Sequence, residues 1–68
     1  MAKMTVREIL DRVEYKYDIM VFIRIGNTCK MYDGESEIKT IPEEILNRVA
    51  TKRAINKLKF VTHVQIWC

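Results

Sequence analysis

The chain has few residues that could carry out covalent or metal chemistry: one histidine, His63, and two cysteines, Cys29 and Cys68. A structural zinc site usually takes four Cys or His ligands in paired spacing, and these three residues lack that spacing. A nucleophilic Cys–His pair needs a third, orienting group, and no such motif is visible. Phosphate-binding loops are glycine-rich, whereas Gly26 and Gly34 are the only glycines. We therefore predict no catalytic residue, no metal and no cofactor, and a protein that is not an enzyme.

The charges are distributed unevenly along the chain. Residues 1–44 carry seven Lys or Arg and nine Asp or Glu, a net charge of −2, whereas residues 45–68 carry five basic residues and no acid. Together they give the net charge of +3. A block of one sign attracts anions such as nucleotides, nucleic acid or acidic protein surfaces. The same block could instead keep a strand edge from aggregating, so both interpretations stay open.

This basic block supplies most of a predicted anion site. The predicted ligand-binding residues are Arg48, Lys52, Arg53, Lys59, His63, Trp67 and Tyr32. The arginines and lysines would contact phosphate, because charge-assisted hydrogen bonds to phosphate are strong. Trp67 or Tyr32 would stack on a base. His63 falls on the same strand face as Lys59 and Trp67 if residues 58–67 are extended.

A helix is predicted to begin at Thr5. Thr5 and Glu8 have the spacing of a capping box, and Val6, Ile9, Leu10 and Val13 then recur on one helical face. The next apolar stretch, Ile19–Ile25, is predicted to be the central strand.

The two faces of this strand differ little in polarity. Ile19, Val21, Ile23 and Ile25 face one way, and Met20, Phe22 and Arg24 face the other. A strand with one wet face alternates apolar and polar residues, and this one does not until Arg24. The first helix can cover one face. For the other face we predict a homo-oligomer interface formed by Met20, Phe22 and Trp67.

The remaining segments predict two hairpins around a short helix. Gly26-Asn27 is a turn signal before a strand at Thr28–Tyr32, and Pro42 suits the first turn of a helix. Residues 49–58 fit two interpretations, a continuation of that helix or a strand that turns at Asn56-Lys57 into a final strand, Leu58–Trp67. We favour the strand.

The predicted fold is therefore a single small α+β domain, residues 1–68, in the order α-β-β-α-β-β. Its sheet is expected to be antiparallel, with a helix packed on one face. The alternative order is α-β-β-α-β with a longer second helix. The longest apolar run, Ile19–Ile23, is far below the roughly 20 residues that span a bilayer, and the first residues lack the apolar core of a secretion signal. We therefore expect a cytoplasmic protein with no membrane partner.

Three motifs resemble a group of very short phage and prophage accessory proteins. They are Thr-Val-x-Glu-Ile-Leu at 5–10, Asp-Gly-Glu at 33–35 and, most specifically, Ile-Pro-Glu-Glu-Ile-Leu-Asn-Arg-Val at 41–49. The chain departs from that group by being more basic after Val49. The resemblance implies an accessory protein in the host cytoplasm, directed against host defence, that works by binding. It also supports a hairpin after the short helix.

Two functions follow as hypotheses. The first is a homo-oligomer that binds or sequesters an anionic nucleotide or oligonucleotide. The alternative is a small inhibitor that docks on a host enzyme, such as a defence protein, through Met20, Phe22 and Trp67, or a minor nucleic-acid-binding protein.

Overall fold

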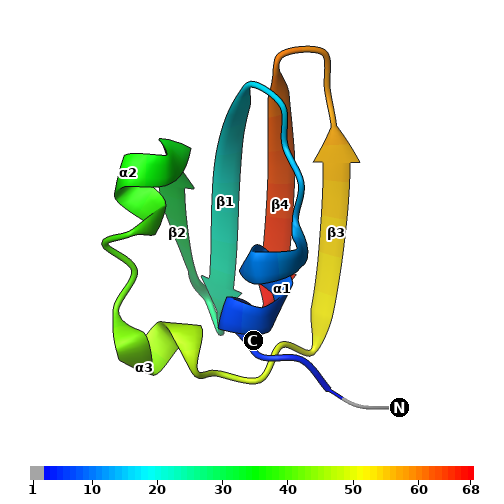
Figure 1. The fold of residues 1–68 in the computed structure, drawn as a ribbon. Coiled ribbons are helices and arrows are strands. Elements are labelled where there is room, and N and C mark those ends of the chain that lie inside the picture. The colour runs from blue at the N-terminus through cyan, green and yellow to red at the C-terminus, as the bar shows by residue number, and fades with distance from the viewer. Residues whose placement is uncertain (1–2) are drawn as a thin grey trace.

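The computed structural model describes residues 3–68, which form three short helices and a four-stranded mixed sheet (Figure 1). In chain order the elements are α1 (Val6–Arg12), β1 (Asp18–Ile25), β2 (Thr28–Asp33), α2 (Gly34–Ile38), α3 (Glu43–Leu46), β3 (Lys52–Lys57) and β4 (Val61–Trp67). The small α+β class predicted from the sequence is confirmed. The element order has one helix more than predicted, because the acidic segment after β2 forms α2 rather than a loop.

The sheet has the strand order β2-β1-β4-β3. β1 pairs with β2, and β3 with β4, in antiparallel hairpins, but β1 and β4 run parallel. The prediction of an antiparallel sheet was therefore wrong. Turn signals determine pairing within each hairpin, whereas the way two hairpins join depends on burial. Joining them through β1 and β4 places the two most apolar strands at the centre.

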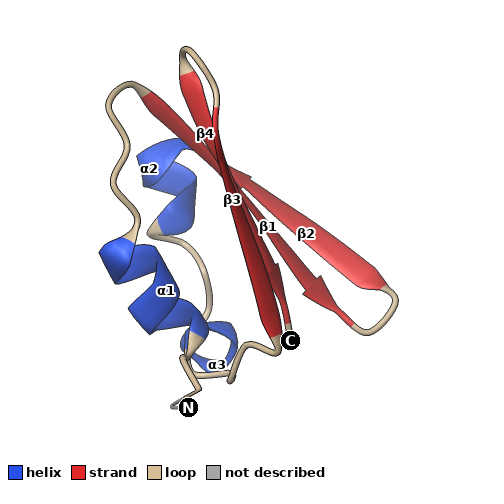
Figure 2. Cartoon of the chain, turned by 90° about the vertical axis from the view of Figure 1, so that its right-hand side faces the viewer, coloured by secondary structure: helices blue, strands red, loops and turns tan. Residues whose placement is uncertain are grey.

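The apolar core lies between this sheet and the helices. The buried apolar residues are Val6 and Ile9 of α1, Ile19, Val21 and Ile23 of β1, Ile41 and Ile45 in and beside α3, and Val64 and Ile66 of β4. Figure 2 shows α1, α2 and α3 on the same side of the sheet and, within residues 3–68, no element on the other side. We call that uncovered side the open face.

The start of α1 follows the predicted capping box. The Thr5 hydroxyl accepts a hydrogen bond from the Glu8 backbone N–H at 3.2 Å, and Glu8 Oε1 accepts one from the Thr5 backbone N–H at 3.1 Å. This reciprocal pair satisfies two backbone donors that a helix start otherwise leaves free. The backbone N–H of Val6 reaches the carbonyl oxygen of Arg48 at 3.0 Å, which joins the start of α1 to the segment before β3.

The strand interpretation of residues 49–58 is confirmed in kind, because β3 spans Lys52–Lys57, and the longer second helix was wrong. The predicted turn at Asn56-Lys57 was also wrong: Lys57 pairs with Thr62, and the chain turns through residues 58–60. Consequently Ala54 lies opposite Gln65 and not opposite Lys59. A two-residue hairpin turn needs positive φ angles, and in residues 3–68 only Gly26 and Gly34 have them. The wider turn through residues 58–60 needs no positive φ angle at a residue other than glycine.

None of the helices in residues 3–68 is long and apolar enough to cross a membrane.

Candidate anion-binding edge and open sheet face

β3 is an edge strand, and all six of its residues are exposed. Lys52, Arg53 and Lys57 belong to it, while Arg48 precedes it and Lys59 lies in the turn that follows. We call these five residues the basic edge. Side chains alternate between the two faces of a strand, but on an edge strand both sets also border the solvent beside the sheet. Three cations therefore lie on the edge strand itself, and one more precedes and one follows it in the chain.

The basic edge has no carboxylate partner. In the part of the chain that the structure describes, the single ion pair within 4 Å joins Arg7 and Glu43, neither of which belongs to the basic edge. Arg53 Nη1 contacts Met4 Sδ at 3.2 Å, a weak and uncharged acceptor. The five positive charges are thus left to attract anions from the solvent.

A hollow lies at the N-terminal end of β3, beside Lys52 and Arg53. It has a volume of about 440 Å³ and is lined by Lys3, Met4, Ile9, Ala50, Thr51, Lys52 and Arg53. Three of these residues are cationic and none is acidic. Backbone hydrogen bonds fix the residues that line this hollow. The Ala50 N–H donates to the Met4 carbonyl oxygen at 2.8 Å, and the Thr51 N–H donates to the Trp67 carbonyl oxygen at 2.7 Å. This end of the basic edge can hold an anion without displacing an internal ion pair.

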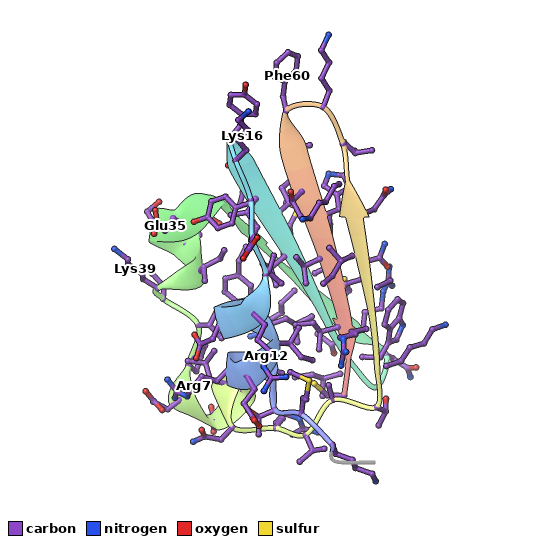
Figure 3. All side chains as sticks on the ribbon, turned by 45° about the vertical axis from the view of Figure 1, so that its right-hand side comes forward. Arg7, Arg12, Lys16, Glu35, Lys39 and Phe60 are labelled. Atoms are coloured by element: carbon purple, nitrogen blue, oxygen red, sulfur yellow. The ribbon has the colours of Figure 1, made fainter. Side chains whose placement is uncertain are left out.

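A second hollow, of about 410 Å³, lies at the other end of β3, between residues 14–18 and residues 57–62. Tyr17 and Phe60, each 63% exposed, meet there edge to face with ring centroids 5.8 Å apart. The Lys59 ammonium lies 5.3 Å from the Phe60 ring centroid. Figure 3 shows Phe60 and Lys16 extending from the same end of the sheet. Exposed rings beside lysines suit base stacking next to a phosphate, although Glu14 and Asp18 also line this hollow.

The open face carries a different set of residues. Strand pairing aligns them in rows across the sheet: Asp33, Met20, His63, Asn56; then Met31, Phe22, Gln65, Ala54; then Cys29, Arg24, Trp67, Lys52. In the last row, Trp67 is flanked by two cations, with the Arg24 guanidinium 5.7 Å and the Lys52 ammonium 5.0 Å from its ring centroid. Phe22 meets His63 edge to face at 5.7 Å.

The structure does not gather the seven predicted ligand-binding residues into one pocket. Lys52, His63 and Trp67 share the open face. Arg53 points to the other side of β3, and Tyr32 pairs with Val21 on the helix side, half-buried against the core. Arg48 and Lys59 lie beyond opposite ends of β3. Met20, Phe22 and Trp67, the predicted interface residues, do share one face.

Three residues of these surfaces were missed from the sequence. Arg24 could have been found, because strict alternation places it on the face of Met20 and Phe22. Lys57 and Phe60 could not, because the misplaced turn put Lys57 in a loop and Phe60 in a strand interior.

Hydrogen bonds from Thr5, first from its backbone N–H and then from its side chain, lower the pKa of the Glu8 carboxyl below its ordinary value. That shift belongs to the helix cap. Both cysteines are free, and among residues 3–68 no group of three or more His, Cys, Asp or Glu side chains could hold a metal ion.

Comparison with known protein families, curated proteins and solved structures finds no match to this chain.

Proposed function

We propose that the protein is a binding module that takes the phosphate backbone of a single-stranded oligonucleotide along the basic edge. The observation that carries this proposal is the set of three cations on the exposed edge strand β3, with Arg48 before it and Lys59 after it in the chain, none of which has a carboxylate partner within 4 Å in the described chain. Cations that are not neutralised within the protein attract polyanions and release counterions from them.

The length of the edge favours an oligonucleotide over a single nucleotide. At about 3.3 Å per residue, Lys52 and Lys57 are separated by about 17 Å along β3. A single phosphate group can meet only one end of such a row, whereas several consecutive phosphates can follow it. One end also carries an exposed aromatic ring beside a lysine, Phe60 with Lys59. Such a ring can stack on bases of any identity.

Sequestration is the form that this binding takes in our proposal, in keeping with the resemblance to phage accessory proteins that act against host defence. No step of covalent chemistry is part of it. A protein of this kind acts by occupancy, so its effect depends on affinity and on its concentration in the host cell.

Fluorescence anisotropy with a labelled oligothymidylate tests the proposal. We expect affinity that falls steeply with salt, since single-stranded binding loses about 0.7 unit of log affinity per log unit of salt for each phosphate contact. Arg53→Gln with Lys57→Gln should make that slope shallower by about 1.4 and weaken binding at low salt by about tenfold. The matched control is Lys30→Gln with Lys39→Gln, which removes the same charge from exposed positions elsewhere.

Equal effects of the two double variants would show a response to net charge alone and would contradict the proposal. So would the absence of binding at low salt, which would leave protection of the strand edge as the role of these cations.

A further inference from the structure

The open face carries several apolar side chains, interrupted on β4 by His63 and Gln65, and no part of the described chain covers it. Met20 and Phe22 on β1, Val61 and Trp67 on β4, and Met31 on β2, which is 54% exposed, lie there. Aromatic residues, methionine and arginine are the types enriched in the cores of protein interfaces. A patch of this kind on so small a domain suggests that the surface is covered by another molecule.

The charges of the open face are arranged by position along the strands. Asp18 and Asp33 lie towards one end, and Arg24 and Lys52 lie in the row at the other end. Within residues 3–68 none of these four residues has an ion-pair partner. The face is therefore neutral overall but polarised. A surface that binds nucleic acid carries net positive charge, so this face suits a partner that is polarised in the opposite sense.

We propose that the partner is a second copy of this chain, packed open face to open face about a two-fold axis that lies between the sheets and perpendicular to the strands. This axis reverses the strand direction in the second copy. The basic end of each sheet then lies over the acidic end of the other. The interface is isologous, so each contact occurs twice.

The register predicts the contacts of this dimer. With the axis midway between the rows of Met20 and Phe22, Arg24 of one copy lies opposite Asp18 of the other, and Met20 opposite Phe22. Trp67 then packs on Val61 of the second copy. Packed sheets cross at about 30° and lie about 10 Å apart, which two layers of such side chains can fill.

Charge decides between this axis and the other two-fold axis that would bring the faces together. An axis parallel to the strands would place like ends together, with two copies of Arg24 and Lys52 at one end and two copies of Asp18 and Asp33 at the other. Like charges placed together across an interface disfavour that arrangement.

The dimer does not depend on the proposed oligonucleotide binding, because Arg53 and Lys57 point away from the open face. In the proposed arrangement both β3 strands come to the same side of the sandwich, and Arg53 and Lys57 of the two copies point to its opposite outer faces.

Sedimentation equilibrium of the full chain tests the dimer. We expect a particle of twice the chain mass of 8.1 kDa. Arg24→Glu or Asp18→Arg alone should weaken dimerisation by at least about tenfold, because each places like charges together at two symmetric points. The double variant Arg24→Glu with Asp18→Arg should restore it. These two residues lie about 20 Å apart within one chain, so a rescue within one chain is excluded.

A monomeric wild-type chain would overturn the proposal and favour docking of a different protein on the open face. A dimer that the double charge reversal fails to restore would overturn the proposed axis. Phe22→Glu provides a second measurement: it should give a monomer that still binds oligothymidylate through its basic edge. A folded Phe22→Glu variant that stays dimeric would also overturn the inference. Failure of oligonucleotide binding with an intact dimer would contradict the proposed function alone.

Discussion

Thr5 and Glu8 show how two side chains determine where a helix begins. Their reciprocal hydrogen bonds satisfy backbone donors at the start of α1, and the bonds from Thr5 lower the pKa of Glu8. A carboxyl whose pKa is lower in the folded state stabilises that state when it is ionised. Glu8 therefore couples the stability of the helix start to pH.

We predict that Glu8→Gln lowers the free energy of unfolding at neutral pH and has no effect at a pH well below the folded-state pKa. The contribution of the Glu8 charge is present in full above its ordinary pKa of about 4.5. It is lost as the pH falls through the lowered pKa of the folded state. Urea unfolding of both proteins between pH 7 and pH 2 measures the difference. Glu14→Gln, at an exposed position after α1, is the control, and an equal loss of stability in that variant would contradict the prediction.

β3 and β4 form one antiparallel hairpin but differ in burial, because β3 is at the edge of the sheet and β4 at its centre. β4 alternates between buried and half-buried residues, because helices cover one side and the open face lies on the other. β3 has no buried residue. Ile55 of β3 and Val64 of β4 occupy paired helix-facing positions and are both β-branched apolar residues, so burial and not residue type distinguishes them.

We predict that Ile66→Ala lowers the free energy of unfolding by about 2–5 kcal/mol, because it leaves a cavity in the core. Ile66 is fully buried, whereas Ile55 is 45% exposed. Ile55→Ala removes the same atoms and should cost less than about 1.5 kcal/mol, since much of this side chain already contacts water. Chemical denaturation of both variants measures the two costs. Similar losses would show that the core extends to β3.

The molecule as a whole is built on the parallel pairing of β1 with β4. These strands are far apart in the sequence, and the second hairpin must return to the first through α2 and α3 (Figure 1). Closing so long a connection costs entropy, which burial of Val21, Ile23, Val64 and Ile66 offsets. The centre of the sheet is thus expected to be its most stable part.

We predict that backbone amides of β1 and β4 exchange hydrogen slowest, with protection close to that of global unfolding, and that amides of β3 exchange much faster. Exchange measured residue by residue by NMR checks this order. Addition of oligothymidylate should raise protection in β3 and leave β1 and β4 unchanged. Slow exchange throughout β3 in the free chain would contradict the expected order.

Local features of the sequence determined much of this protein. The capping box of α1 and the extended state of residues 19–25 follow from short-range patterns, which also favoured, without deciding, a strand at residues 52–57. Alternation alone placed Met20 and Phe22 together. Such features depend on contacts between residues close in the sequence, so they can be predicted without a fold.

Only the tertiary structure decided how the two hairpins meet and which residues share a surface. The parallel contact of β1 and β4 depends on burial between distant segments, and the turn at residues 58–60 depends on backbone angles that residue type indicates only weakly. A shift of register by one residue sends a side chain to the other face of a sheet. That is why the sequence predicted a basic block, whereas the structure was needed to place it along an edge and to leave the open face neutral and polarised.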